Sequence, residues 1–240
     1  MPTLEGWGAS DRGLVRQNNE DSLFLDHDLC LALVADGMGG ASSGEVASAL
    51  AIETVAAYVR QPPLEWPPAQ LLEEAIQEAN RRVLERASSD LHCAGMGSTI
   101  VAALWRLPEM FIANVGDSRA YLWRAGVLTQ LSYDQTLVNE LRQRFGLTDE
   151  EVSNFPHRNV LTMAVGASGD MTVCMHELRL EPGDRILLCS DGLSGPVSPA
   201  GLSETLAAEA PLEELVGRLI AAAKEKGAPD NVTAVLLRYL

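Results

Sequence analysis

The sequence has few aromatic residues, few basic residues and only four cysteines. Phe, Trp and Tyr make up 5% of the 240 residues, so we expect a core built mainly from Ala, Leu and Val. Lys and Arg number 18 against 33 Asp and Glu, and the formal net charge of −15 argues against binding to nucleic acid or to an anionic membrane surface. A hydrophobic content of 47% excludes a disordered chain.

The four cysteines are scattered, and no two of them have C-x-x-C spacing. We therefore expect neither a zinc site nor disulfides, and the cytoplasm is the expected compartment. No uncharged apolar run approaches the roughly 18 residues that a membrane span needs. Residues 1–5 carry neither the basic nor the apolar region of a signal peptide.

Apolar runs separated by short gaps predict antiparallel strands, because parallel pairs need long crossover connections. Strands are expected at Ser22–Leu25, Leu29–Ala35, Ser98–Leu104, Met110–Val115, Arg119–Trp123, Val127–Leu131, Val160–Val165, Met171–Leu178, Arg185–Cys189 and Asn231–Tyr239. Helices are expected at Ser43–Val59, Ala69–Ala87, Gln135–Arg142 and Leu212–Lys226. This grouping indicates an α+β layered fold. With no internal repeat and no long linker, residues 1–240 are predicted to form a single domain with a mobile loop, or flap, at about 146–159.

Acidic residues recur beside glycine or asparagine, often where an apolar run ends. The motifs are Asn19-Glu20-Asp21, Asp36-Gly37-Met38-Gly39-Gly40, Gly116-Asp117-Ser118, Ser190-Asp191-Gly192 and Pro229-Asp230-Asn231. Any one of them alone is typical of a turn. Asp36, Asp117 and Asp191, however, follow runs that we expect to be buried strands. We therefore expect these three carboxylates at the rim of a sheet.

Carboxylates gathered at one rim repel each other, at a cost of several kcal/mol, unless a cation lies among them. Oxygen ligands without His or Cys favour Mg²⁺, Mn²⁺ or Ca²⁺ over Zn²⁺. Paired ions of this kind can activate a water and hold a phosphoryl group. Arg16, three residues before Asn19, is the candidate to bind the phosphate, since a guanidinium matches phosphate oxygens in a bidentate manner. The alternative for Arg16 is an ordinary solvated surface arginine.

Six motifs, in this order and spacing, resemble those of the metal-dependent serine/threonine protein phosphatases of type 2C (PPM), in particular the bacterial branch. They are Arg16-x-x-Asn19-Glu20-Asp21, Asp36-Gly37-Met38-Gly39-Gly40, Gly97-Ser98-Thr99, Gly116-Asp117-Ser118-Arg119, Ser190-Asp191-Gly192 and Asp230-Asn231-Val232-Thr233. The resemblance extends from about Trp7 to Leu237. It implies a four-layer α-β-β-α sandwich, in which helices flank two antiparallel sheets and a metal site lies at one end.

The resemblance also implies two core Mn²⁺ or Mg²⁺ ions and a weaker third ion. Asp36 would bridge the two core ions, and the carbonyl of Gly37 would bind one of them. Asp191 and Asp230 would bind the second core ion. Asp117, together with Asp191, would hold the third ion.

The resemblance also implies roles for Arg16, Glu20 and Asp21. Glu20 and Asp21 would act largely through metal-bound waters. Arg16 would hold the phosphate of the substrate, and a metal-bridging hydroxide would attack phosphorus without a phosphoenzyme. The residues expected to take part directly in catalysis are Arg16, Asp36 and Asp191.

Three positions depart from the usual family pattern. Met38 stands where animal members have a histidine, as in other bacterial members, so protonation of the leaving group would fall to a metal-bound water. Gln135 replaces a histidine, and Met163 replaces an arginine. The last two changes lie near the predicted flap and bear on substrate preference rather than on metal chemistry.

The implied function is hydrolysis of phosphoserine and phosphothreonine in proteins, opposing a bacterial serine/threonine kinase. The protein is expected to act as a monomer. Two alternatives use the same fold: a hydrolase of small phosphate esters and a non-catalytic module that binds phosphoproteins. The presence of Arg16 and of all the predicted metal carboxylates argues against the non-catalytic module.

Overall fold

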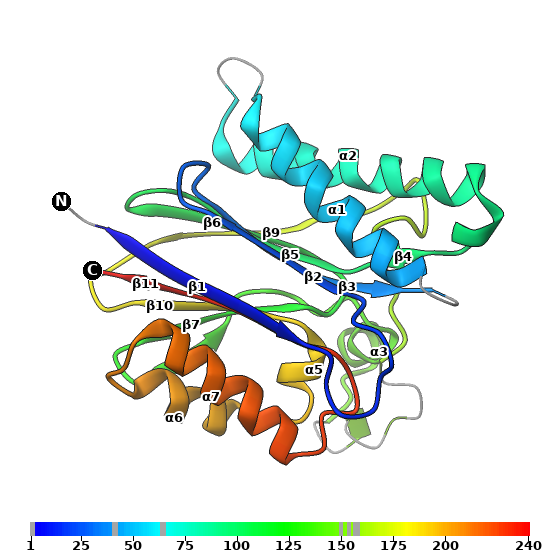
Figure 1. The fold of residues 1–240 in the computed structure, drawn as a ribbon. Coiled ribbons are helices and arrows are strands. Elements are labelled where there is room, and N and C mark those ends of the chain that lie inside the picture. The colour runs from blue at the N-terminus through cyan, green and yellow to red at the C-terminus, as the bar shows by residue number, and fades with distance from the viewer. Residues whose placement is uncertain (1–2, 40–42, 63–65, 149–150, 153–154, 156–158) are drawn as a thin grey trace.

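The computed structural model describes residues 3–39, 43–62, 66–148, 151–152, 155 and 159–240. Two antiparallel sheets pack face to face, and helices cover the outer face of each sheet (Figure 1). This is the four-layer α-β-β-α arrangement that the resemblance implied. Among the described helices, none combines the length and the apolar character needed to cross a bilayer.

The strands of each sheet come from distant parts of the sequence. The first sheet has the order β1 (Leu4–Asp11), β11 (Val232–Tyr239), β10 (Arg185–Cys189), β7 (Arg119–Arg124) and β8 (Val127–Gln130). The second has the order β2 (Asp21–Asp26), β3 (Leu31–Met38), β5 (Ile100–Arg106), β6 (Glu109–Val115) and β9 (Cys174–Arg179), with the short strand β4 (Gly97–Ser98) paired to the end of β3.

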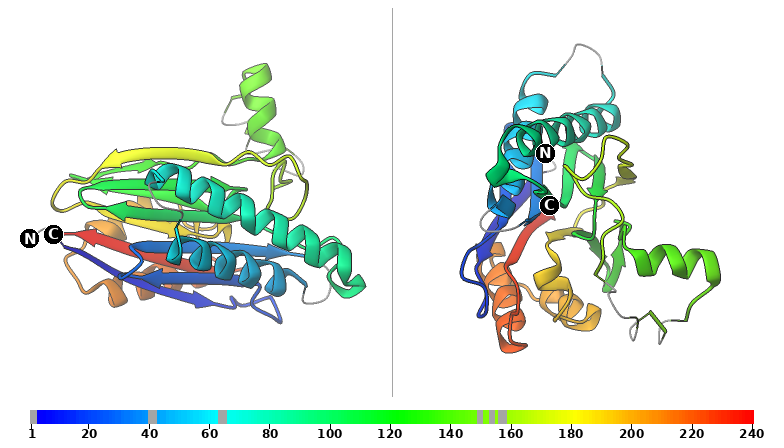
Figure 2. Two further views of the ribbon diagram at one scale, coloured as in Figure 1. Left: turned by 90° about the horizontal axis from the view of Figure 1, so that it is seen from above. Right: turned by 90° about the vertical axis from the view of Figure 1, so that its right-hand side faces the viewer.

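Two long helices cover the second sheet, and two shorter ones cover the first (Figure 1). The helices are α1 (Ser43–Arg60) and α2 (Pro68–Ser89) over the second sheet, α6 (Pro199–Ala207) and α7 (Leu212–Glu225) over the first, the one-turn α5 (Asp191–Ser194), the 3-10 turn η1 (Leu91–Cys93) and α3 (Leu137–Phe145). Figure 2 shows that α3 projects from one end of the sandwich, whereas the two termini lie together at the other end.

β3 shows why the central strands have continuous apolar sequences. Leu31, Leu33 and Ala35 face α1 and α2, whereas Ala32 and Val34 face the opposite sheet, and all five are fully buried. Successive side chains of a strand point to opposite faces, so a strand covered on both sides must be apolar at every position. The burial of β3 on both faces fixes the position of the polar residues that follow it.

The sequence prediction missed β1, α5 and α6. β1 contains Gly6 and Gly8, and glycine weakens the strand signal. A Cβ would lie 2.8 Å from the Leu237 side chain at Gly6 and 2.9 Å from the Val235 side chain at Gly8, so a larger residue at either position would require these core side chains to shift. Their position against β11 is a tertiary constraint that the local sequence does not reveal.

The structure corrects two other predictions, one for the start of α3 and one for the segment between α3 and β9. Val160–Val165 is not a strand: Leu161 and Val165 each form one isolated bridge, to Thr136 and Ser98, which belong to different segments. The helix predicted from Gln135 begins instead at Leu137, because the Thr136 hydroxyl accepts a hydrogen bond from the backbone N–H of Asn139 at 3.4 Å and acts as its N-cap. Of the predicted flap, residues 149–150, 153–154 and 156–158 lie outside the described residues.

Candidate metal centre

The structure brings the predicted acidic residues together at the end of the sandwich opposite the termini. They come from the β1–β2 loop, the start of β2, the end of β3, the β6–β7 turn, α5 and the segment before β11. A cavity of about 370 Å³ is lined by Arg16, Glu20, Asp36, Gly37, Asp117, Asp191 and Asp230. Asp21 is buried beside this group, with 8% of its surface exposed.

Asp36 is the centre of this arrangement, and its place in the fold differs from the prediction. It lies inside β3 rather than after it, since the strand continues to Met38. Asp36 is directly opposite Asp21 on β2 in the strand register. Its backbone N–H donates to the Thr99 hydroxyl at 3.0 Å, and its carbonyl accepts from the Thr99 N–H at 2.8 Å. These two bonds fix the backbone of Asp36 and thereby the point from which its carboxylate projects.

Glycine at position 37 is required by the close approach of α1. A side chain there would collide with the backbone carbonyl of Gly44. The Gly37 N–H donates to the Glu20 carbonyl at 3.1 Å, so β3 is tied to the β1–β2 loop at this point. The resulting contact between backbones places Gly37 at the cavity wall, where its main chain faces the acidic cluster.

Asn231 joins two segments of the site and received no role from the sequence. Its side-chain oxygen accepts from the Glu20 N–H at 2.8 Å, and its side-chain nitrogen donates to the carbonyls of Arg12 and Asn18 at 2.9 Å. Asn231 is 4% exposed. It thus holds the loop that carries Arg16 against the segment that carries Asp230. The signal was present in the Asp-Asn-Val-Thr motif, but its partners are more than 200 residues away along the chain.

The carboxylates raise one another's proton affinity. Burial, and then the charges of Asp21, Asp191, Asp230 and Asp117, raise the pKa of Asp36 well above its usual value. Burial is also the main reason why the pKa of Asp21 is raised to about 6 and that of Asp117 to about 7. Burial and the neighbouring Asp230 raise the pKa of Asp191. The protein groups around the cluster are therefore not sufficient to stabilise all of these carboxylates in their charged form.

These residues fit a hard divalent cation. Among the described residues, nothing hydrogen-bonds to the buried atoms Asp21 Oδ1 and Asp191 Oδ1. An orphaned carboxylate oxygen is costly unless something positive neutralises it. The available donors are oxygens, which suit Mg²⁺ or Mn²⁺. Within the described part of the chain, no three Asp, Glu, His or Cys side chains form a ready-made metal cluster. The carboxylates instead surround the cavity.

Arg16 lies at the edge of the same cavity and has a partner that the sequence did not indicate. Its Nη2 donates to Asp230 Oδ2 at 2.6 Å, and the two side chains are 49% and 31% exposed. The pair is therefore open to solvent, where such ion pairs contribute little to stability. The arrangement places a planar guanidinium directly over the acidic rim.

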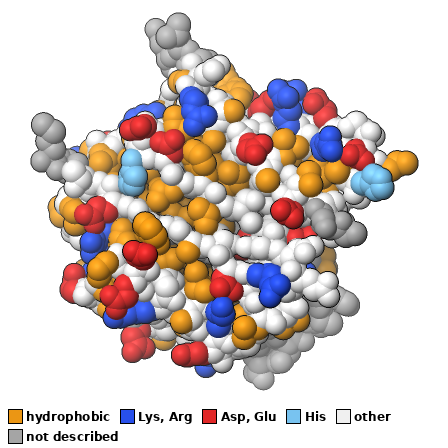
Figure 3. Space-filling view, in the orientation of Figure 1, with side chains coloured by type: hydrophobic (Ala, Val, Ile, Leu, Met, Phe, Trp, Pro, Cys, Tyr) orange, Lys and Arg blue, Asp and Glu red, His pale blue; other side chains and the backbone are white. Residues whose placement is uncertain are grey.

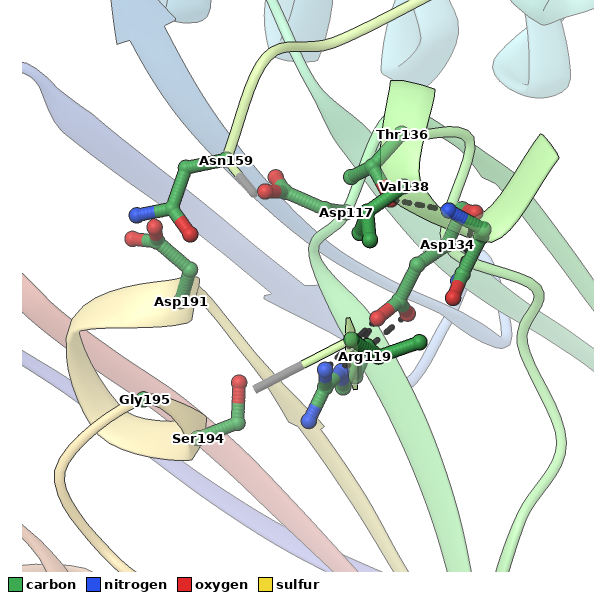
Figure 4. A pocket seen from close by; sticks show the side chains of 11 residues that line it. Asp117, Arg119, Asp134, Thr136, Val138, Asn159, Asp191, Ser194 and Gly195 are labelled. Atoms are coloured by element: carbon green, nitrogen blue, oxygen red, sulfur yellow. Dashed lines mark hydrogen bonds and ion pairs between the residues drawn. The ribbon is translucent and has the colours of Figure 1, made fainter. Parts of the chain in front are cut away.

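A second cavity, of about 300 Å³, adjoins the first (Figure 4). Asp117 and Asp191 line both cavities, and Asn159 lies across from Asp191. Arg119 forms one wall and is held by Asp134 through contacts of 3.1 Å from Nε and 2.6 Å from Nη2. A substrate group bound among the carboxylates would have this second space beside it.

The raised pKa values predict that the metal-free protein loses stability as the pH rises. Unfolded Asp deprotonates near 3.8, whereas Asp21 and Asp117 in the folded chain hold their protons to about 6 and about 7. Between these values the folded state binds more protons than the unfolded state, so the free energy of unfolding falls as pH increases. Urea unfolding in a chelator should give a lower value at pH 8 than at pH 5, and Mn²⁺ should reverse the loss. A metal-free protein that is more stable at pH 8 would contradict this electrostatic account.

Away from the site, the face shown in Figure 3 has Lys and Arg side chains interspersed with Asp and Glu. Oppositely charged residues one turn apart also pair within helices, as Arg82 does with Glu78 at 2.8 Å on α2 and Arg218 with Glu214 at 2.6 Å on α7.

Comparison with known proteins identifies the family. The sequence matches the protein phosphatase 2C family over residues 6–237. It is 36% identical over 239 residues to the serine/threonine phosphatase stp of Listeria innocua, covering 95% of this chain and 93% of that protein. The crystal structure of the Mycobacterium tuberculosis serine/threonine phosphatase PstP/Ppp is similar, with a TM-score of 0.90, 37% identity and 98% coverage of both chains. The catalytic domain of PstP in complex with two manganese ions gives a TM-score of 0.88 and 36% identity, with both chains fully covered. This chain belongs to the protein phosphatase 2C family.

Proposed function

We propose that this protein is a metal-dependent phosphatase that hydrolyses phosphoserine and phosphothreonine in proteins. The observation that carries the proposal is the cavity at the end of the sandwich, where Asp36, Asp191 and Asp230 converge and Arg16 lies at the rim. Carboxylates there can hold cations, and the guanidinium above them can hold the phosphate that the cations attract. The serine/threonine phosphatases among the similar proteins support the same activity.

We further propose that the site takes two Mn²⁺ or Mg²⁺ ions and a weaker third ion. The manganese complex of PstP supports the two core ions. The residues proposed to hold the ions are Glu20, Asp21, Asp36, Gly37, Asp117, Asp191 and Asp230. When bound, such ions supply Lewis acidity for the attack of water on phosphorus and stabilise the charge that develops there.

The protein's own groups would position the substrate. Arg16 can donate to phosphate oxygens that point out of the cavity, because a guanidinium carries five N–H donors in one plane. Asp36 and Asp191 line the cavity, so a phosphoryl group bound there would face both carboxylates. The polypeptide of a phosphoprotein would extend from the rim toward the second cavity beside Asp117.

The remaining features of the proposal concern the protein as a whole. We propose a single catalytic domain over residues 1–240, acting as a monomer on phosphorylated proteins and opposed to a serine/threonine kinase. The family match over residues 6–237 supports the single domain. The cytoplasm stays the predicted compartment.

Turnover of two substrates tests the activity. The protein should release phosphate from a phosphothreonine peptide in Mn²⁺ and should lose this activity in excess chelator. An aryl phosphate such as p-nitrophenyl phosphate should give a kcat/KM lower by at least about tenfold, since it lacks the peptide contacts that orient the phosphate. Preference for the aryl phosphate would favour the small-ester hydrolase, and the absence of turnover on both would favour the binding module.

A further inference from the structure

We propose that Gln135 is the positioning residue that holds the Asp117 turn in place for the weakly bound third ion and connects this turn to the segment that follows the flap. The inference rests on the proposed function, because it concerns one of the proposed metal ligands. Gln135 itself lines neither cavity at the site. It acts through the backbone next to Asp117.

The Asp117 turn begins at Gly116, which has a positive φ of 91°. A Cβ at this position would lie 2.8 Å from the Thr99 side chain, so glycine is needed for conformation and for space. Gln135 binds both polar backbone atoms of Gly116. The Gly116 N–H donates to Gln135 Oε1 at 2.9 Å, and the Gln135 N–H donates to the Gly116 carbonyl at 3.0 Å.

The other groups of Gln135 bind two segments further along the chain. Its Nε2 donates to the Thr172 carbonyl at 2.8 Å, ahead of β9, and lies 3.4 Å from the Cys174 sulfur. Its carbonyl accepts from the Thr162 N–H at 2.9 Å, just after the predicted flap. Gln135 is 5% exposed, so water does not compete for these bonds. One side chain and its peptide group therefore join three segments.

The residues on either side of Gln135 are held just as firmly. Asp134 pairs with Arg119 on β7, two residues after Asp117. Thr136 caps α3 and bridges to Leu161. Removing the Gln135 side chain should therefore leave Asp134 and Thr136 in place. The main effect should be on the backbone peptide at Gly116, which loses its hydrogen bond to Gln135 Oε1. The orientation of the Asp117 carboxylate depends on that peptide.

The side-chain chemistry explains how glutamine can stand where related proteins have histidine. A neutral histidine offers one ring nitrogen as an acceptor and the other as a donor. The amide of Gln135 offers the same pair, the acceptor to Gly116 and the donor to Thr172. A side chain without both groups would leave the buried Gly116 N–H unpaired and would break the bond to the Thr172 carbonyl.

Calorimetric titration with Mn²⁺, without substrate, tests this role. The difference between the isotherms of the wild-type protein and Asp117→Ala defines the weak site. Gln135→Met keeps the length of the side chain but removes its hydrogen bonds to Gly116 and Thr172. We expect Mn²⁺ to bind about tenfold more weakly at the weak site, with its affinity for the tight sites unchanged. Gln135→His at pH 8 should restore binding to within about twofold, since its neutral ring is again a donor and an acceptor. Gln135→Asn, with its shorter reach, serves as the second variant if Gln135→Met does not fold.

A matched control distinguishes positioning from general loss of packing. Gln77 on α2 donates through Nε2 to the Met171 carbonyl at 2.9 Å, next to the carbonyl that Gln135 binds, but it does not contact the Asp117 turn. Gln77→Leu should therefore leave binding at the weak site unchanged. The proposal is overturned if Gln135→Met binds the weak ion as the wild-type protein does, if Gln77→Leu weakens it equally, or if Asp117→Ala leaves the isotherm unchanged. Because no substrate is present, none of these outcomes depends on whether the wild-type protein is a phosphatase.

Discussion

Asp36→Asn should abolish Mn²⁺-dependent turnover of a phosphothreonine peptide. Asp36 lies inside β3 and is held on both sides of its peptide by Thr99, so the asparagine would occupy the same place without the charge. Burial, and then the charges of four other carboxylates of the cluster, raise the pKa of Asp36. Changes to residues that only support metal ligands cost about 10- to 100-fold. Loss of the central carboxylate should cost more than about a hundredfold in kcat.

The same substitution should stabilise the metal-free protein. The Asp36 carboxyl lies among Asp21, Asp191 and Asp230, whose charges oppose its ionisation. Replacing it with a neutral amide removes this repulsion, so the free energy of unfolding at pH 8 in chelator should rise. The stabilisation by Mn²⁺ should shrink at the same time. Lost activity with gained metal-free stability is the signature of a metal ligand rather than of a structural residue.

Asp184→Asn gives the matched contrast at the opposite end of the sandwich. Asp184 is 1% exposed and accepts from Arg124 Nε at 2.8 Å and Nη2 at 2.6 Å. Its amide variant should lower the free energy of unfolding by about 1–3 kcal/mol and leave turnover per folded molecule unchanged. Steady-state kinetics and urea unfolding on both variants decide the matter. Near-normal Mn²⁺-dependent activity in Asp36→Asn would remove Asp36 from the metal centre.

Local sequence patterns predict an α+β layered fold and the acidic rim, whereas the four-layer sandwich follows only from the resemblance to the type 2C phosphatases. A strand buried on both faces must be apolar throughout, and β3 shows this from Leu31 to Ala35. The polar residue that follows such a run must then lie near the end of the sheet. The rule does not reveal that β3 continues past Asp36, since its last residues are held by β4 and by the Glu20 carbonyl.

The features that sequence patterns missed depend on contacts between distant segments. Asn231 binds residues on the β1–β2 loop, more than 200 positions earlier. Gln135 looked like a departure from the family pattern, but in the structure it supplies an acceptor to Gly116 and a donor to Thr172. Nothing near either residue in the sequence indicates these partners. The ion pair between Arg16 and Asp230 is of the same kind.

Arg16→Ala should lower kcat/KM for a phosphothreonine peptide by about 10- to 100-fold. Charge-assisted hydrogen bonds contribute about 1.5–3 kcal/mol each, and the variant loses those that the guanidinium would make to the phosphate. The Arg16–Asp230 pair is largely exposed, so breaking it should change stability by no more than about 1 kcal/mol. Affinity for the core ions should therefore stay nearly the same while turnover falls.

Two further variants separate the shape of the guanidinium from its charge. Arg16→Lys keeps the positive charge but not the planar fork, so it should remain impaired with the metal affinity of the wild-type protein. Arg12 lies on the same loop and is exposed, but its Nη1 donates to the Gln17 carbonyl at 3.2 Å and the residue does not line the cavity. Arg12→Ala should keep kcat/KM within about twofold of the wild-type value, since a solvated surface charge contributes little. If Arg16→Ala behaves as Arg12→Ala does, Arg16 is a surface arginine and the phosphate must be held by other groups of the site.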